Sequence, residues 1–196
     1  MKWFRSLTLA ILWTMALGLS SCGNEPQPAP LKPGGLQVGD SAADFSLMDA
    51  SGHIRKLSDV QKDWYLVLVF YRGHWCGACQ NQLLNLKDDF AKFAPLHATL
   101  AAVSVDSVEE SADFNHNWNL PFPLLSDSHL SLIDSYGIRH PKGHEEKDIS
   151  RPCVVIIDPQ KTIRYKFVGV LPTDRPSDNE ILFTLQKLEQ ETPQKP

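Results

Sequence analysis

The pattern of apolar residues predicts a buried strand that leads directly into a helix in the first half of the chain. Residues 65–71 read YLVLVFY, and an unbroken run of Val, Leu and aromatic residues is typical of a strand buried on both faces of a sheet. After a short turn, apolar side chains recur at steps of three and four residues, which predicts a helix over 80–93. The apolar face of this helix consists of Leu83, Leu86, Phe90 and Phe93.

Further apolar runs predict more strands beside the first one. Residues 99–105 and 153–157 consist mostly of Ala, Val, Leu and Ile, as expected for central strands. Alternating polar and apolar residues between 38 and 60 predict a half-buried hairpin at the start of the folded part. Residues 162–168 predict the return strand of a second hairpin, and residues 124–125 a brief pairing.

Helices are expected between these strands. The pattern predicts a helix over 108–118 and a short one within 130–136, while Ser177 and Glu180 form a capping box that opens the last helix. Residues 140–150 are mostly polar and predict a loop. Strands that alternate with helices indicate an α/β domain, with a central mixed sheet, helices on both faces and an N-terminal β-hairpin extension. Such a sheet places its chemistry at the carboxyl ends of its strands.

The first residues predict an export signal rather than part of the fold. Lys2 and Arg5 precede an apolar run at 7–19 that is too short to span a membrane comfortably as a mature helix. Small residues then lead into Cys22, which resembles the signal of bacterial lipoproteins, whose cysteine is lipidated. The alternative is an ordinary secretory signal that leaves Cys22 as a free thiol. Both predict export to a compartment where disulfides persist.

The expected domain organisation follows from these segments. A signal peptide is predicted over 1–21, a Pro/Gly-rich tether over 22–37, a folded domain over 38–190 and a flexible tail over 191–196. We therefore expect a domain in the bacterial cell envelope, anchored to a membrane by a lipid on Cys22 and facing the extracytoplasmic side. The net charge of −4 gives no basic field, so no nucleic-acid partner is expected.

Two cysteines carry the candidate chemistry. Cys76 and Cys79 lie in the turn between the buried strand and the helix, where unpaired N–H groups and the helix dipole favour a thiolate. Cys76 is nearer the helix start and is expected to be the nucleophile, and Cys79 is expected to resolve the mixed disulfide. The alternative is half of a metal site, but no second Cys-x-x-Cys or Cys/His pair follows at zinc-finger spacing. We expect neither a metal nor a cofactor.

Five segments between residues 38 and 188 carry a resemblance to a known family. They are VGDSAADF at 38–45, VFYRGHWCGAC at 69–79, PLLSD at 123–127, YGI at 136–138 and RPCVVIID at 151–158. Together they resemble the redoxin or AhpC/TSA (peroxiredoxin-like) family of the thioredoxin-like superfamily. The export signal and Trp-Cys-x-x-Cys are also similar to the membrane-tethered thiol-disulfide oxidoreductases of bacterial envelopes. The resemblance implies a thioredoxin-like fold and an oxidoreductase.

The resemblance also gives Pro152 a role. In thioredoxin-like proteins, a proline six residues before the acid that ends a strand forms a cis peptide bond opposite the dithiol, and Pro152 and Asp158 match this spacing. The expected cis bond leaves the backbone of Arg151 free to face an incoming peptide or thiol. The alternative is a trans proline that begins a strand.

The sequence departs from both family patterns. Peroxiredoxins carry Pro-x-x-x-Thr/Ser-x-x-Cys, whose last cysteine attacks peroxide. With Cys79 in that place, Arg72 stands at the proline position and Cys76 at the hydroxyl position. Arg72 or Arg151 is then left to polarise a peroxide. Thioredoxins have a buried acid six residues before the first cysteine, where this chain has Phe70.

Other residues near the dithiol have two interpretations each. Trp75 either shields the disulfide or is a core aromatic residue, and the two roles are compatible. His74 and Arg72 either lower the pKa of Cys76 by their charge or are solvated loop residues. Cys153 is either a resolving thiol or, as we prefer, an inert buried residue. The polar segment after residue 139 contains His140 and His144. These two histidines are either a metal site or, as we expect, part of a solvated loop.

Three hypotheses of function follow. The leading one is a thiol-disulfide oxidoreductase that cycles Cys76 and Cys79, with protein thiols or disulfides as substrates and an electron donor or acceptor protein of the envelope as partner. The second is a peroxiredoxin-like thiol peroxidase that reduces hydroperoxides. The third is a non-catalytic lipoprotein whose redoxin domain binds a metal or a partner and whose disulfide is structural.

Overall fold

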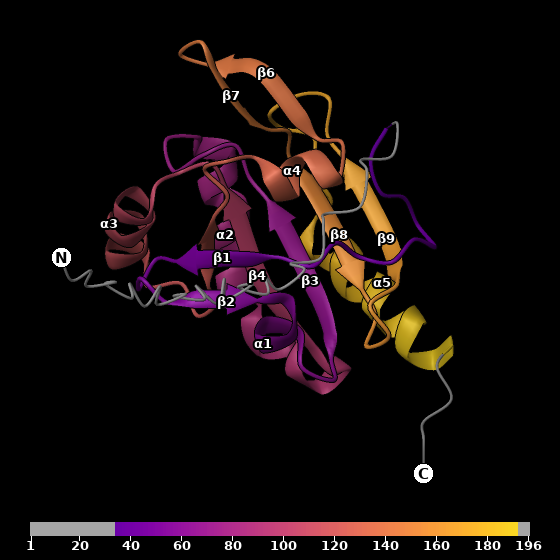
Figure 1. The fold of residues 1–196 in the computed structure, drawn as a ribbon. Helices are drawn as coiled ribbons and strands as arrows, with labels where there is room; N and C mark the ends of the chain where they lie inside the picture. The colour runs from indigo at the N-terminus through magenta and orange to yellow at the C-terminus, as the bar shows by residue number, and fades with distance from the viewer. Residues whose placement is uncertain (1–33, 192–196) are drawn as a thin grey trace, which may run out of the picture. The chain divides into compact units, whose positions relative to one another are not determined.

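The computed structural model describes residues 34–191, which form a central sheet with helices around it (Figure 1). The expectations for the signal peptide, for Cys22 and the tether up to residue 33, and for the tail beyond residue 191 lie outside these residues. In the part of the chain that is described, none of the helices has the length and apolar character needed to span a bilayer.

Seven strands form one mixed sheet in the order β2-β1-β5-β4-β3-β8-β9, and two more, β6 and β7, pair only with each other. Strand β3 is parallel to β4 and antiparallel to β8, and β4 is parallel to β5. The strands are β1 (Ser46–Asp49), β2 (Ile54–Lys56), β3 (Tyr65–Phe70), β4 (Ala98–Ser104), β5 (Leu124–Ser126), β6 (Arg139–His144), β7 (Lys147–Ser150), β8 (Cys153–Ile157) and β9 (Ile163–Val168).

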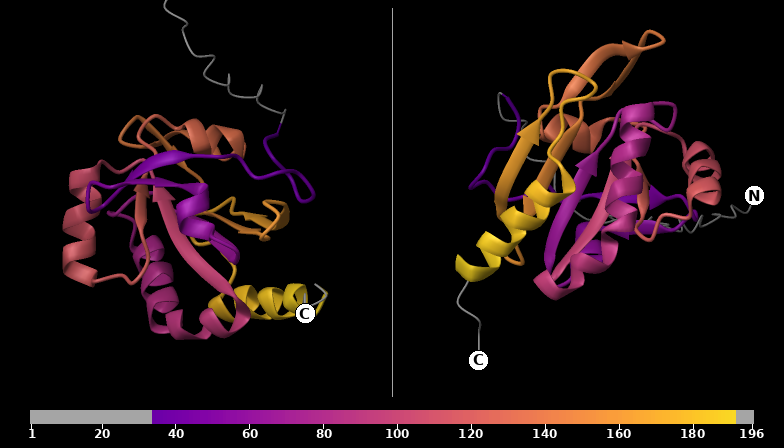
Figure 2. Two further views of the ribbon diagram at one scale, coloured as in Figure 1. Left: turned by 60° about the horizontal axis from the view of Figure 1, so that its bottom comes forward. Right: turned by 180° about the vertical axis from the view of Figure 1, so that it is seen from behind.

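The helices cover both faces of the large sheet, and alternate residues of β3 belong to opposite cores. Val67 and Val69 pack with α2, α3 and α5, whereas Leu66 and Leu68 pack with α1 and α4. Figure 2, in its right-hand view, shows α2 and α5 across one of these faces. The helices are α1 (Leu57–Gln61), α2 (Gly77–Asp88), α3 (Val108–Trp118), α4 (Ser131–Ser135) and α5 (Asp178–Glu191), with 3₁₀ turns at Phe90–Lys92 and Ala94–Leu96.

Most of the predicted elements are confirmed, including the α/β class and its mixed sheet. Every residue of β3 is buried, as the apolar run predicts. Both hairpins form, β1 with β2 and β8 with β9. The capping box before α5 also forms, because the Glu180 carboxylate accepts hydrogen bonds from the backbone and hydroxyl of Ser177.

Four expectations about the elements are wrong. The segment predicted as a polar loop at 140–150 is the β6–β7 hairpin, whose residues are exposed or half-buried apart from Ile149 and Ser150, so its sequence lacks an apolar alternation. The helix after the cysteines ends at Asp88, and two 3₁₀ turns follow, the second of which contains Pro95. The first hairpin ends at Lys56 rather than near residue 60, because Leu57 begins α1. The final helix continues to Glu191, the first residue of the expected tail.

Candidate functional site

The two cysteines lie where the sequence predicts, at the carboxyl end of β3 and the start of α2. Cys76 has an extended backbone and is the N-terminal cap of α2. Its carbonyl accepts hydrogen bonds from the N–H groups of Cys79 and Gln80, at 2.9 Å each. Its own N–H donates to the carbonyl of Gly73 at 3.1 Å. The turn therefore holds both sulfur atoms on the first turn of the helix.

Both cysteines are free thiols and both are buried. Cys76 is 5 % exposed and Cys79 is 0 % exposed, so the expected nucleophile is the more exposed of the two although it too is buried. A hydrogen bond from the Cys79 side chain lowers the pKa of Cys76, aided by the Cys79 backbone and by the charges of two arginines, and opposed by burial. The same hydrogen bond, together with burial, raises the pKa of Cys79. The lowered pKa favours the thiolate form of Cys76, and the raised pKa favours the protonated form of Cys79.

Two arginines supply this positive charge. The backbone N–H of Arg72 lies 3.4 Å from the Cys79 sulfur, and Nη2 of Arg175 lies 3.7 Å from it. Nη1 of Arg175 also donates to Gln82 Oε1 at 2.9 Å, and Nη2 to the carbonyl of Pro172. Sequence reasoning missed Arg175, which comes from the loop before α5 and is 96 residues away from Cys79 in the chain. No local pattern around it signals this contact.

Trp75 and Arg72 meet the tip of the β6–β7 hairpin at the site. The Trp75 ring stacks on the His144 ring, with centroids 3.5 Å apart and planes 15° apart. The Arg72 guanidinium lies 5.0 Å from the Trp75 ring centroid, and its Nη2 donates to the carbonyl of Gly143 at 2.9 Å. His144 was expected in a solvated loop, and instead it covers Trp75.

His74 is engaged by Asp106, which follows β4. The His74 backbone donates to Asp106 Oδ2 at 2.8 Å, and its Nδ1 lies 3.2 Å from Oδ1. The hydroxyl of Ser104 also donates to Asp106 at 2.9 Å. With Glu110, these residues form a set that could hold a metal ion, because one ligand atom from each of His74, Asp106 and Glu110 lies within 4.8 Å of the other two. Because Asp106 already accepts three hydrogen bonds and Glu110 caps α3, we interpret the group as the anchor of the turn.

Gly73 is required in this turn by the close approach of two side chains. A Cβ atom at this position would lie 2.5 Å from Trp75 Nε1 and 3.0 Å from Asp106 Oδ1. The glycine therefore lets the indole pack against the turn beside the dithiol.

The expected cis bond at Pro152 is absent, since no peptide bond among residues 34–191 is cis. The trans form is the ordinary one for an X–Pro bond, and here the carbonyl of Pro152 accepts a hydrogen bond from Gly169 at 2.7 Å. The backbone of Arg151 donates to Ile138 at 2.8 Å, so this N–H is not free for a substrate. Burial is the largest cause that lowers the pKa of His140, and the charge of Arg151 lowers it further.

Cys153 lies on the opposite face of the sheet from the dithiol. It packs in the core with Phe70 and Tyr136, whereas Cys76 and Cys79 belong to the other core. Burial raises the pKa of its thiol to about 12. This placement favours the inert interpretation of Cys153 over a resolving role.

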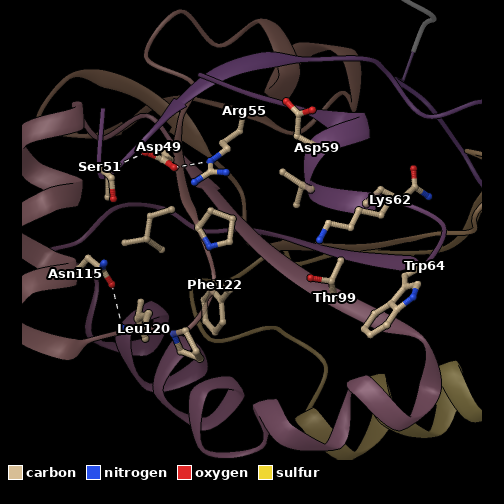
Figure 3. A pocket seen from close by; sticks show the side chains of 16 residues that line it. Asp49, Ser51, Arg55, Asp59, Lys62, Trp64, Thr99, Asn115, Leu120 and Phe122 are labelled. Atoms are coloured by element: carbon tan, nitrogen blue, oxygen red, sulfur yellow. Dashed lines mark hydrogen bonds and ion pairs between the residues drawn. The ribbon is translucent and has the colours of Figure 1, made fainter. Parts of the chain in front are cut away.

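Two hollows in the surface bear on the site. One of about 340 Å³ adjoins the dithiol and is lined in part by Ala78, Gln82 and Arg175. Another of about 490 Å³ lies at the other end of the sheet, where Trp64 and Thr99 mark the starts of β3 and β4. Figure 3 shows this second hollow, in which Asp49 holds Arg55 through a hydrogen bond of 2.6 Å. It is therefore not the entrance to the dithiol.

Comparison with known proteins gives consistent results. The model of the AhpC/TSA family matches residues 38–166. Peroxiredoxin Bcp of Bacillus subtilis is 33% identical over 124 residues, which cover 62% of this chain and 78% of that protein. A putative peroxiredoxin of Mycobacterium tuberculosis, Rv1608c, is 28% identical over 128 residues, covering 65% of this chain and 83% of that protein.

Solved structures confirm the thioredoxin-like fold. The crystal structure of peroxidoxin BcpB from Mycobacterium tuberculosis matches with a TM-score of 0.70 and 26% identity, covering 78% of this chain and 98% of that one. A peroxiredoxin 6 of Arenicola marina matches with a TM-score of 0.74 and 20% identity, covering 82% of this chain and 76% of that one.

Proposed function

Because this chain belongs to the AhpC/TSA family and is a thioredoxin-like oxidoreductase, we propose that it is a thiol-disulfide oxidoreductase cycling Cys76 and Cys79. One observation supports this assignment above the others. Two free thiols lie together on the first turn of α2, where the Cys79 side chain and the charges of two arginines lower the pKa of Cys76. A stabilised thiolate beside a protonated partner is the arrangement that disulfide exchange requires.

The proposed exchange has two steps. The Cys76 thiolate attacks one sulfur of a substrate disulfide, forming a mixed disulfide while the other substrate sulfur leaves as a thiolate and takes up a proton. Cys79 then loses its proton and attacks the Cys76 sulfur, which forms the Cys76–Cys79 disulfide and releases the second substrate thiol. Two electrons pass from the dithiol to the substrate. The same steps in reverse oxidise a substrate dithiol.

Hydroperoxide reduction is a second candidate, supported by the peroxiredoxin relatives and by the arginines at the Cys79 sulfur. A thiolate sulfur would attack one peroxide oxygen, the O–O bond would break, and an alcohol or water would leave with a proton. The resulting sulfenic acid would condense with the other thiol, giving the Cys76–Cys79 disulfide and water. Cys76 stands where peroxiredoxins carry a hydroxyl, so the arginines would orient the peroxide.

A trapping experiment tests the first candidate. The Cys79→Ser variant should accumulate mixed disulfides through Cys76, whereas the Cys76→Ser variant should accumulate none. Cys153→Ala is the matched control and should behave as the unmodified protein, because Cys153 lies on the other face of the sheet. Equal trapping by both serine variants, or by neither, would reject the assigned roles.

A kinetic experiment tests the second candidate. Stopped-flow mixing of the reduced protein with hydrogen peroxide should give a rate well above that of free cysteine. Sulfenic acid should be detectable in whichever of the variants Cys76→Ser and Cys79→Ser keeps the attacking thiol. A rate no faster than free cysteine excludes the peroxidase. Failure of both experiments would leave only a structural disulfide.

We also propose that the domain is exported and anchored to a membrane of the cell envelope through Cys22. The support comes from the sequence, in which Lys2 and Arg5 precede the apolar run at 7–19 and small residues lead into Cys22. In a bacterial host, the protein should incorporate labelled palmitate and sediment with membranes. Cys22→Ser should lose both properties and Ser6→Ala neither. Labelling of the Cys22→Ser variant would contradict the anchor.

A further inference from the structure

We propose that the β6–β7 hairpin selects the reactants of the dithiol by their width. Its tip holds Trp75 as a cover beside Cys76. This cover admits slender reactants, such as a hydroperoxide or an extended peptide disulfide, and excludes broad folded surfaces. The proposal deepens the proposed function, since it names the class of substrate that reaches the same two sulfur atoms.

The first argument is the position of the hairpin. It pairs with no strand of the large sheet, and it stands clear of that sheet at the end where β3 and β4 finish (Figure 1). That end carries the dithiol, because Cys76 follows β3 directly. A separate hairpin at the mouth of a site restricts the directions from which a reactant approaches.

The second argument is the set of contacts at the tip. The Trp75 ring contacts two groups: it stacks on the His144 ring, and the Arg72 guanidinium lies 5.0 Å from its centroid. The hydrogen bond from Arg72 to Gly143 fixes the hairpin to the same cluster. Stacking and cation–π contacts of this kind stabilise one arrangement of an otherwise mobile aromatic side chain.

The third argument is the anchoring of the hairpin at its base. Arg139 binds Asp134 of α4 and Asp148 of β7, the latter at 2.8 Å. The amide of Arg151 also donates to Ile138. Because the base is held independently of the tip, loss of one tip contact loosens the cover while the hairpin itself stays folded.

The fourth argument is the exposure of the reactive sulfur. Cys76 is the expected nucleophile and is only 5 % exposed. Trp75, its neighbour in the chain, packs against the core that contains both cysteines. A broad partner surface cannot readily reach a residue that is covered to this extent, whereas a small molecule or a single extended strand needs a much smaller opening.

The test compares two reagents that share one reacting group. Methyl methanethiosulfonate is small, and the same head group coupled to a rigid fluorescein dye is broad. Both modify the Cys76 thiolate in the reduced protein, so the readout does not depend on the physiological substrate. In His144→Ala, the rate with the broad reagent should rise by about threefold to tenfold, as expected for loss of one ring–ring contact. The rate with the small reagent should change much less.

Two further variants complete the experiment. His144→Phe keeps a ring against Trp75 and should restore the low rate with the broad reagent. Glu146→Ala changes an exposed residue of the same hairpin and should leave both rates as they are. An equal change with both reagents in His144→Ala, or no change with either, overturns the proposal.

The outcome is separable from that of the proposed function. Size discrimination without any trapped mixed disulfide would leave the cover intact as a property of the site and refute the exchange reaction. Trapping of broad folded partners at the same rate as slender ones would refute the cover and leave the exchange reaction in place.

Discussion

The acidity of Cys76 depends chiefly on one neighbouring atom group, the thiol of Cys79. That side chain donates a hydrogen bond to the Cys76 sulfur and is the largest cause of its lowered pKa. A free cysteine has a pKa of about 8.5. Cys76 should therefore stay a thiolate as the pH falls below that value, and it should lose its charge only when the pH falls through its own lower pKa.

Two substitutions of Cys79 should distinguish the effect of its hydrogen bond on the pKa of Cys76 from the effect of its sulfur atom. Cys79→Ala removes the donor, so the midpoint of Cys76 alkylation against pH should rise by about one unit or more, toward that of a free thiol. Cys79→Ser keeps a donor at the same place and should retain most of the lowered value. The rate of reaction with iodoacetamide between acid and alkaline pH measures this midpoint. Equal midpoints in the two variants would contradict the assigned hydrogen bond.

Arg175 is the second residue whose loss should be visible in the same profile. Its charge lowers the pKa of both thiols. In Arg175→Ala, the midpoint for Cys76 should rise by about one unit, a tenfold loss of thiolate at a pH below the midpoint. Activity should recover at alkaline pH, because the thiolate then forms without help. Arg175→Lys keeps a charge and should show a smaller shift; a profile unchanged by Arg175→Ala would refute this role.

At the scale of elements, the turn between β3 and α2 is tied to the end of β4 by Asp106. This carboxylate is buried and accepts hydrogen bonds from His74 and Ser104. The neighbouring strand therefore supplies a buried acid to the turn that precedes the dithiol, although Phe70 stands where thioredoxins have theirs.

Removal of that carboxylate should loosen the turn. Asp106→Ala leaves the buried donors of His74 and Ser104 without a partner, so the free energy of unfolding should fall by about 1–3 kcal/mol. Urea denaturation measures this change. Asp113→Ala, at an exposed position of α3, is the control and should stay within about 0.5 kcal/mol. A loss in Asp106→Ala no greater than in the control would show that the turn is held by other contacts.

At the scale of the whole molecule, the redox state should set the stability of the domain. The hydrogen-bonded thiolate and its two arginines stabilise only the reduced form, since a disulfide carries no charge. We therefore expect the reduced protein to have the higher Tm at neutral pH and the dithiol to be more oxidising than thioredoxin, whose potential is about −270 mV.

Thermal unfolding with and without a reductant checks this expectation. The advantage of the reduced form should shrink as the pH falls through the pKa of Cys76, because protonation removes the stabilised thiolate. A higher Tm for the oxidised form at neutral pH would contradict it. The potential itself follows from equilibration with glutathione.

Local patterns were enough to predict much of the fold. The apolar run at β3, the helical spacing in α2 and the bounds of α3 and β8 follow from side-chain periodicity, which the burial of a sheet or helix face imposes directly. The position of Cys76 and Cys79 at a strand-to-helix turn follows from the same patterns. The β6–β7 hairpin was missed because most of its residues are exposed or half-buried, and such a hairpin imposes no apolar period on its sequence.

By itself, then, the sequence determined the α/β class and the place of the two cysteines at the start of a helix. Tertiary structure decided which charges and rings surround them, because Arg175, Asp106 and His144 come from segments far apart in the chain. It also decided that Cys153 faces the other core. Contacts of this kind arise when elements pack together, and the free energy that fixes them is that of the assembled sheet and not of any short segment.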